Sequence, residues 1–217
     1  MSVKDRVPHV KSRRSYDATK RQERSRHTHE TLLDAALERF NEHGYAATTI
    51  ESIAGAADVS EATIYKTYGG KPGIVRALCV RALGGRGPVP AERRSDALKA
   101  TEADPRKVIE GWGRLTAEVA PRVAPILLLL SDAAAGDAAA AGLHAELDRD
   151  RLVRMTENAR YLADGGHLRT GIGLAHASDV LWTYSSPEVF DLLVRQRGWS
   201  LRRYSRFIAG SIVAALL

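Results

Sequence analysis

The sequence contains a single cysteine, Cys79, and no long hydrophobic run. One cysteine excludes an intrachain disulfide and a zinc site built from several thiolates of the same chain. The longest purely aliphatic run covers residues 126–130, far short of the ~20 residues that a membrane-spanning helix needs. No apolar signal segment follows the basic start of the sequence. We therefore expect a protein of the reducing cytoplasm that does not cross a membrane.

Aromatic residues make up only 6% of the chain, and no segment has the alternating apolar pattern of a β-strand. Motifs of common enzymes are missing as well, including a glycine-rich phosphate loop and a nucleophile elbow. The histidines do not pair with carboxylates at metal-ligand spacing, and His27 and His29 would not share a helix face. The sequence thus predicts neither an enzyme nor a metal site, and it implies no cofactor.

Apolar residues recur at helical spacing through most of the chain, which predicts an all-α fold. Gly44 marks a left-handed helix end, and hydroxyl residues precede the apolar stripes that follow. Either Thr48 or Thr49 can cap the second helix, and Ser60 caps the third. For the amino-terminal part the pattern predicts helices over residues 28–44, 50–57, 60–68 and 71–83.

The remainder of the chain is also predicted to be helical. Asp104 and Pro105 form a cap followed by a first-turn proline, and the helix that they start is expected to end or kink at Pro121 and Pro125. The low-complexity segment "AAAGDAAAAG" is interpreted as a joint between helices. Further helices are predicted over residues 143–163, 175–185, 187–197 and 200–217.

Positive charge is concentrated near the amino terminus. The chain has a net charge of +6, and residues 1–30 contribute nine Lys/Arg against four Asp/Glu, or +5 of that total. Residues 1–24 lack apolar periodicity and are interpreted as a flexible basic tail. Such a tail either serves solubility alone or contacts a polyanion, and a neighbouring nucleic-acid motif would favour the second interpretation.

The segment "VSEATIYKTYGGK", residues 59–71, is unusual for a surface helix. Exposed helices normally alternate carboxylates with lysines, but here Ile64 and Tyr68 form an inner face and the outer face carries small, hydroxyl-bearing and basic groups. A helix-turn-helix needs such a second helix to enter the major groove. Thr63 can hydrogen-bond a base edge, and Lys66 can reach guanine O6 and N7. The segment therefore predicts a DNA-reading helix.

Residues 28–83 resemble the DNA-binding domain of the TetR family of bacterial transcriptional regulators. The resemblance rests on "AALERFNEHGYAATTIESIA" and "DVSEATIYKTYGGK", whose apolar and turn positions fall where the family places them. Asp58 stands where the family commonly has glycine, and aspartate tolerates turn conformations. Glu61 would face a polyanion unless it accepts from a cytosine amino group. By position the resemblance implies DNA contacts from Thr49, Ser60, Glu61, Ala62, Thr63, Tyr65, Lys66, Thr67 and Lys71.

With this motif beside it, the basic tail is predicted to contact the DNA backbone or minor groove, which would raise affinity and salt dependence. The chain is thus divided into the tail, residues 1–24, a helix-turn-helix domain, residues 25–83, and a larger helical domain, residues 84–217. The tail residues expected at the DNA are Arg13, Arg14, Lys20, Arg21 and Arg24.

The resemblance assigns dimerisation and ligand binding to the larger domain. It implies that the last two helices form the interface of a homodimer, although their apolar stripes would also fit an intrachain core. It also implies a pocket for a small lipophilic ligand among the middle helices. Core packing is the alternative role for each of the pocket candidates, which are Trp112, Leu127, Met155, Asn158, Tyr161, Trp182 and Tyr184.

The resulting hypothesis is a homodimeric transcriptional regulator, a repressor that a ligand releases from a palindromic operator. In the mechanism that the resemblance implies, the ligand displaces the helix over residues 71–83 and changes the separation of the two recognition helices. The alternatives are a constitutive or architectural DNA-binding protein without an effector and an all-helical enzyme, which the missing motifs disfavour.

Overall fold

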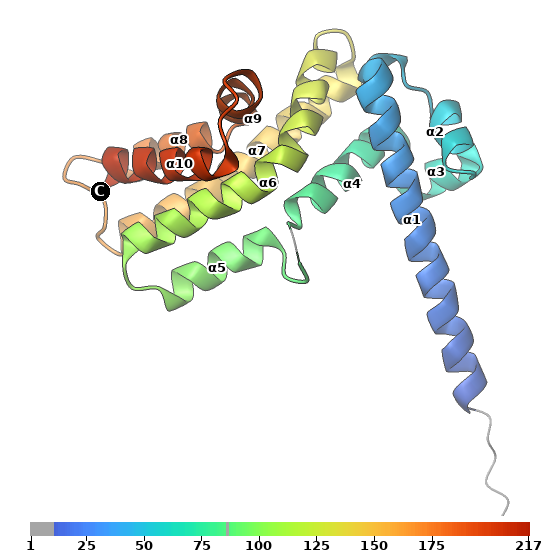
Figure 1. Cartoon of the computed structure of the whole chain (residues 1–217), viewed down its shortest axis with the longest axis horizontal. Helices are drawn as coiled ribbons and strands as arrows, with labels where there is room; N and C mark the ends of the chain where they lie inside the picture. The colour runs from blue at the N-terminus through green and yellow to red at the C-terminus, as the bar shows by residue number, and fades with distance from the viewer. Residues whose placement is uncertain (1–10, 86) are drawn as a thin grey trace, which may run out of the picture.

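The computed structural model describes the backbone of residues 11–85 and 87–217, and the side chains from Lys20 onward apart from Arg21, Gln22 and Arg86. Every regular element in this part of the chain is a helix, which confirms the all-α prediction. The helices form a small amino-terminal head, α1 to α4, and a larger carboxy-terminal bundle, α5 to α10 (Figure 1). No described helix combines the length and the apolar character that a membrane crossing requires.

Local caps place the helices of the head. Ser60 Oγ accepts a hydrogen bond from the Thr63 backbone N–H at 3.2 Å and starts the third helix. Gly69 takes the left-handed conformation, with φ 72°, and ends that helix. The head contains α1, Lys11–Ala47, α2, Ile50–Ala56, α3, Glu61–Tyr68, and α4, Lys71–Leu83.

Thr49, and not Thr48, is the cap of α2. Its side chain accepts from the Ser52 N–H at 3.0 Å, and Ser52 Oγ accepts from the Thr49 N–H at 3.3 Å, which completes a capping box. The Thr48 hydroxyl instead donates toward the carbonyls of Arg39 and Gly44, at 3.0 and 2.7 Å, and ties the end of α1 to the start of α2.

The first helix is much longer than predicted. It starts at Lys11, so residues 11–24 are helical and the expectation of a flexible tail is wrong for them. Lysine, arginine, glutamine and glutamate are good helix formers, and extending an existing helix costs far less than starting a new one. The first part of the expected tail, residues 1–10, lies outside the described residues. Gly44, with φ 76°, breaks the helical geometry where the first helix was predicted to end.

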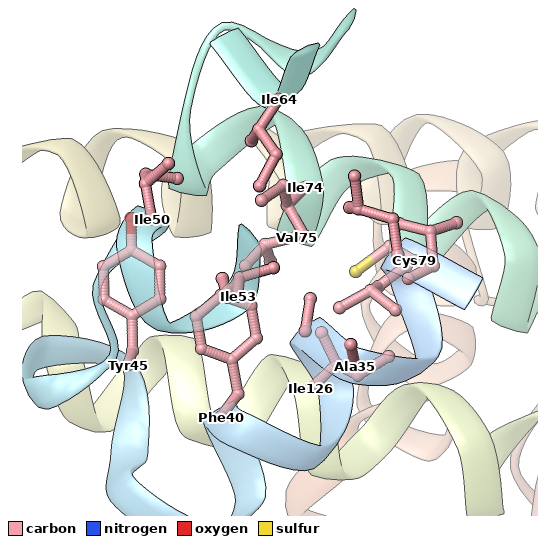
Figure 2. Close-up of a cluster of buried hydrophobic side chains, with 14 of the residues drawn as sticks. Ala35, Phe40, Tyr45, Ile50, Ile53, Ile64, Ile74, Val75, Cys79 and Ile126 are labelled. Carbon is pink, nitrogen blue, oxygen red and sulfur yellow. The ribbon is translucent and has the colours of Figure 1, made fainter. Parts of the chain in front are cut away.

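A shared core joins the head to the bundle. Phe40, Ile53 and Ile64 come from α1, α2 and α3, are at most 1% exposed and converge in Figure 2. Burying one such side chain contributes ~1.5–3 kcal/mol. Ile126 and Leu130 of the bundle belong to the same cluster, so the head does not have a core of its own. The division of the chain at residue 84 therefore remains a proposal.

Six further segments make up the bundle. α10 packs along α6, and Gly113 permits the close approach, since a Cβ there would lie 2.7 Å from the Ser205 carbonyl oxygen. The segments are α5, Ala91–Thr101, α6, Pro105–Ala134, α7, Ala138–Asp164, α8, Leu174–Tyr184, α9, Pro187–Phe190, which continues in the π-helical turn η1, Asp191–Gln196, and α10, Leu201–Leu216.

The bundle differs from the predictions in two places. Of the two outcomes expected at Pro121 and Pro125, an end of the helix is excluded, because α6 continues through both prolines to Ala134. A proline inside a helix costs about 3 kcal/mol, and burial of the surrounding apolar residues, such as Ala124 and Leu130, offsets this cost. The helix α5 was not predicted at all, because Leu98 is its only large apolar residue and so leaves no periodic stripe.

Candidate nucleic-acid interface

A short turn with a fixed geometry joins α2 to α3. Asp58 lies in the left-handed region, with φ 53°, and the Val59 N–H donates to the Ala54 carbonyl at 3.0 Å. Aspartate enters this region more readily than most residues, which explains how it replaces glycine here. The arrangement of α2, turn and α3 is that of a helix-turn-helix.

α3 buries one side and exposes the other. Ile64 is fully buried and Tyr68 is half-buried against the core of the head, so the remaining side chains face outward. Tyr65 is 54% exposed at the flank of this outward side. All predicted contact residues on α3 are exposed, namely Glu61, Ala62, Thr63, Tyr65, Lys66 and Thr67. Their contacts with DNA remain predictions.

The two capping residues also lie on the surface, at the amino ends of α2 and α3. Thr49 and Ser60 are exposed, and the free N–H groups of a helix start favour an anion such as a phosphate. Ser60 Oγ lies 2.9 Å from Thr63 Oγ1. A hydroxyl both donates and accepts, so Thr63 can keep this contact and still hydrogen-bond a base.

Lys71 has a structural role that the sequence did not reveal. Its ammonium donates to the carbonyls of Tyr45 and Ala46, at 2.9 and 3.4 Å, and lies 4.5 Å from the centroid of the Tyr45 ring. These carbonyls belong to the last turn of α1, where a cation is favourable. An ammonium has three donors, so one remains for the predicted phosphate contact.

Replacing Lys71 by methionine is expected to destabilise the protein by ~1–2 kcal/mol, because two carbonyls lose a charged donor. Denaturant unfolding of the full chain measures this change. Lys66→Met is the matched control, since Lys66 has no intramolecular partner among the described residues, and it should change stability by less than ~0.5 kcal/mol. Equal stabilities of the two variants would show that the hydrogen bonds from Lys71 to the end of α1 do not contribute to the free energy of unfolding.

His29 and Tyr68 form a second contact that sequence reasoning missed. His29 Nδ1 on α1 lies 2.9 Å from the Tyr68 hydroxyl on α3, and the two rings meet edge to face. Burial raises the pKa of Tyr68 above its ordinary value, so its hydroxyl remains a donor at neutral pH. Thirty-nine residues separate the pair, and no local pattern indicates it.

The amino-terminal half of α1 projects beyond the head (Figure 1). Lys20 and Arg24 are exposed on it, whereas the side chains of Arg13, Arg14 and Arg21 lie outside the described residues. A helical backbone is better suited to contacts with phosphates than to threading into the minor groove as an extended arm. The DNA contacts of this segment remain a proposal.

Four of the seven ligand candidates lie together. Trp112 on α6 meets Tyr161 on α7 edge to face, with ring centroids 6.2 Å apart. Met155 and Asn158 precede Tyr161 on the same side of α7 and lie within the same part of the bundle. These four residues are therefore able to line one site.

The other three candidates make different contacts. Leu127 packs against the core of the head, and the guanidinium of Arg151 lies 4.5 Å from the ring centroid of Trp182. Tyr184 packs against the same core cluster as Trp112, and its ring meets Phe207 of α10. Helical spacing alone does not say which side of a long helix faces which neighbour, and a pocket lined by these residues remains a prediction. Two surface hollows, of about 470 and 580 Å³, lie along α1 in the head.

The described residues contain no cluster of His, Cys, Asp or Glu that could hold a metal ion. Cys79 is 2% exposed in the core of the head. Burial raises the pKa of its thiol to about 12, so the unreactive protonated form dominates at neutral pH. Cys79 is therefore an inert core residue.

The exposed α3, its short turn and its capped neighbour define the class of this protein, which carries a helix-turn-helix DNA-binding domain. Residues 32–78 match the model of the family described as bacterial regulatory proteins, tetR family. This amino-terminal part of the chain is thus similar to the DNA-binding region of the tetR family, in agreement with the resemblance in its sequence.

Curated relatives match in one part of the chain only. YvkB of Bacillus subtilis (strain 168), described as an uncharacterized HTH-type transcriptional regulator, is 39% identical over 74 residues, which are 34% of this chain and 39% of that protein. YdeS of the same organism is 38% identical over 63 residues, 29% of this chain and 32% of that protein. The alignments thus span about a third of the length of each relative.

Solved structures extend the likeness to the fold of nearly the whole chain. NalD, the secondary repressor of the MexAB-OprM multidrug efflux pump in Pseudomonas aeruginosa, superposes with a TM-score of 0.70 at 18% identity over 89% of this chain and 98% of that one. FadR from Bacillus subtilis, in complex with stearoyl-CoA, does so with a TM-score of 0.68 at 18% identity over 87% and 99%. At these identities the likeness shows the fold alone.

Proposed function

We propose that the chain is a sequence-specific transcriptional regulator that represses by binding a palindromic operator. The outward face of α3 carries this proposal. Ala62 permits close approach to the groove, Thr63 and Lys66 present groups that read base edges, and no carboxylate follows Glu61 to repel the DNA. The helix starts at α2 and α3 supply the surrounding phosphate contacts.

We propose that the regulator is a homodimer, since one head reads few base pairs and two heads match a palindrome. The segment from α9 through η1 and the helix α10 would form the interface. Large apolar groups are exposed there, with Leu192 54% and Leu201 and Phe207 each 38% exposed. Trp199 and Tyr184 surround Phe207, at 5.4 and 6.2 Å between ring centroids. Such an aromatic cluster is typical of the centre of an interface.

Replacing Phe207 by alanine is expected to weaken dimerisation by ~2 kcal/mol or more. In a two-fold symmetric dimer the substitution removes one ring from each subunit, so the interface loses two. Sedimentation velocity over a dilution series measures the monomer–dimer equilibrium. Val89→Ala, in the connection between α4 and α5 and 45% exposed, is the control and should leave the equilibrium unchanged. A Phe207→Ala variant that dimerises like the control would exclude this interface.

We further propose that an effector in the bundle releases the DNA by moving α4. The helix is tied to both parts of the molecule: Arg81 pairs with Asp34 of α1 at 2.7 Å, and Arg76 pairs with Glu146 of α7 at 2.6 Å. A displacement of α7 would therefore shift α4 and with it the adjoining α3. Since effector and DNA prefer different states, each must weaken the binding of the other by the same factor.

Other proteins with this fold have been solved with molecules that contain large apolar groups, stearoyl-CoA in FadR and triclosan in SmeT. SmeT superposes with a TM-score of 0.67 at 24% identity over 88% of this chain and 91% of that one. A lipophilic effector is consistent with the mainly apolar character of the α6–α7 group around Trp112.

The experiment that tests the proposal is capture of sheared genomic DNA from the encoding organism by the immobilised full-length chain at near-physiological salt. A regulator should enrich a small number of loci by orders of magnitude over the rest. Uniform coverage of the genome would contradict the proposal and favour the architectural alternative, in which binding is electrostatic and independent of sequence.

A further inference from the structure

The junction of α5, α6 and α7 differs from the apolar remainder of the bundle. α5 turns Ser95, Leu98 and Lys99 toward its neighbours, and only Leu98 is a large apolar residue. Leu98 lies against Gly111 of α6, where an added Cβ would collide with it. Lys99 reaches Asn158 of α7, so α5 covers the groove between the other two helices.

Hydrogen-bond donors collect at this junction. Ser95 and Trp112 are each only 6% exposed, and within the described part of the chain neither the Ser95 hydroxyl nor Trp112 Nε1 has a hydrogen-bond partner. Leaving a buried polar group without a partner costs ~1–3 kcal/mol. The indole N–H can only donate, so it requires an acceptor. Buried donors of this kind need an acceptor, and a bound ligand can supply one.

The contacts between helices place these donors along one groove of the bundle, with Ser95 about one turn before the contact between Lys99 and Asn158 and the contact between Trp112 and Tyr161 about one turn after it. Ser95 precedes Lys99 by one turn of α5, and the Lys99 ammonium donates to Asn158 Oδ1 at 3.2 Å. Trp112 meets Tyr161, which follows Asn158 by about one turn of α7. Asn158 is 5% exposed and its carbonyl oxygen accepts from Lys99, so a further contact of this side chain with a ligand would come from its amide nitrogen, which can only donate.

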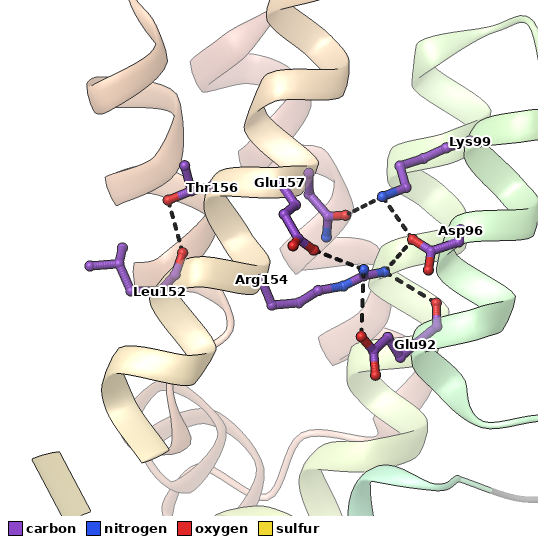
Figure 3. Close-up of polar contacts among 8 residues, drawn as sticks. Glu92, Asp96, Lys99, Leu152, Arg154, Thr156 and Glu157 are labelled. Atoms are coloured by element: carbon purple, nitrogen blue, oxygen red, sulfur yellow. Dashed lines mark hydrogen bonds and ion pairs between the residues drawn. The ribbon is translucent and has the colours of Figure 1, made fainter. Parts of the chain in front are cut away.

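The charged groups beside the junction are paired with one another. Arg154 of α7 lies 2.7 Å from Asp96, 3.2 Å from Glu157 and 3.9 Å from Glu92, and Lys99 lies 2.8 Å from Asp96 (Figure 3). Hydrogen bonds from Arg154 and Lys99 hold the pKa of Asp96 below its ordinary value, so it stays ionised at neutral pH. Two cations against three carboxylates leave a local charge of −1, which disfavours an acid.

We infer that the effector is an uncharged, mainly apolar molecule with a carbonyl-type acceptor, such as a ketone, ester or amide, and that this acceptor binds between Ser95, Trp112 and Asn158. The inference rests on the proposed effector response and specifies its chemistry. A carboxylate would meet the net negative charge, and an amine would bring further donors to a site that already has an excess of them.

Isothermal titration calorimetry of the full-length protein without DNA tests the inference, with 2-decanone, decanoate and decylamine as probes of equal chain length. The ketone is expected to bind at least about tenfold more tightly than either charged probe. Ser95→Ala, Asn158→Leu and Trp112→Phe should each weaken ketone binding three- to tenfold, as expected for one lost hydrogen bond. Equal affinity for the three probes, or no binding of the ketone, would overturn the inference.

Thr156→Ala is the matched control, because the Thr156 hydroxyl on α7 already donates to the Leu152 carbonyl at 2.9 Å. It should bind 2-decanone like the unmodified chain. Thermal unfolding without a probe gives an independent measurement: Ser95→Ala should be at least as stable as the unmodified protein, since it removes a buried hydroxyl without a partner. A Ser95→Ala variant that loses stability and keeps its ketone affinity would show that the hydroxyl serves the fold alone.

These results are separable from the proposed function as a whole. A protein that enriches defined genomic loci but binds the three probes alike keeps its role as a DNA-binding regulator and loses the assigned effector chemistry. A protein that prefers the ketone but enriches no loci would support the ligand site and contradict the proposed binding to an operator.

Discussion

Replacing Gly73 by alanine is expected to destabilise the head by about 3 kcal/mol and to weaken DNA binding more than tenfold. Gly73 lies in the first turn of α4, where the backbone passes directly over the end of α3. A Cβ at this position would collide with the Tyr68 carbonyl group. The obstacle is backbone and not a flexible side chain, so α3 and α4 would have to separate, and the recognition helix would move with them.

Denaturant unfolding and DNA binding of the Gly73→Ala variant measure these two effects. Gly55→Ala is a control with the opposite expected sign. A Cβ at Gly55, on the exposed side of α2, would meet no atom within 4 Å, and alanine in a helix interior is favoured over glycine by ~0.5–1 kcal/mol. The account of the α3–α4 contact would be wrong if both variants gained stability.

Lys66→Ala is expected to remove base discrimination at one position of each half-site, at a cost of ~1–3 kcal/mol per half-site. Lys66 is exposed on the outward face of α3, and a lysine there can donate to guanine O6 and N7. A homodimer contains two such contacts, so the loss of binding free energy for the whole operator is about twice the loss for one half-site. Sequencing of the DNA selected by the variant and by the unmodified chain compares the preference at every position.

Lys107→Ala, an exposed lysine near the start of α6, is the control for the loss of one positive charge far from α3. It should leave the selected sequence unchanged. A uniform loss of affinity for all sequences with Lys66→Ala would assign Lys66 to the phosphate backbone and contradict its role in base reading.

The helix-turn-helix could be predicted because its determinants are local. The caps at Thr49 and Ser60, the turn at Asp58 and the apolar spacing around Ile64 lie within about 20 consecutive residues, so their pattern is visible in the sequence. The outward face of α3 followed directly from this periodicity.

Other features depend on long-range contacts and have no local signal. Lys71 reaches the end of α1 and His29 reaches Tyr68, in both cases over more than 20 residues. α5 lies against the bundle mainly through polar and small groups, so hydrophobic periodicity could not reveal it, and Ser95 and Lys99 were missed with it. The prolines of α6 are tolerated only because the bundle buries the residues around them.

The central claim is that the outward face of α3 reads DNA sequence as part of a dimer. Selection of binding sites from a random duplex pool, with the full-length chain at near-physiological salt, tests this claim most directly. The account predicts recovery of one palindrome whose half-sites are separated by about one helical turn or a multiple of it. Recovery of no shared sequence would mean that binding is only electrostatic, and it would contradict the assignment of α3 as a recognition helix.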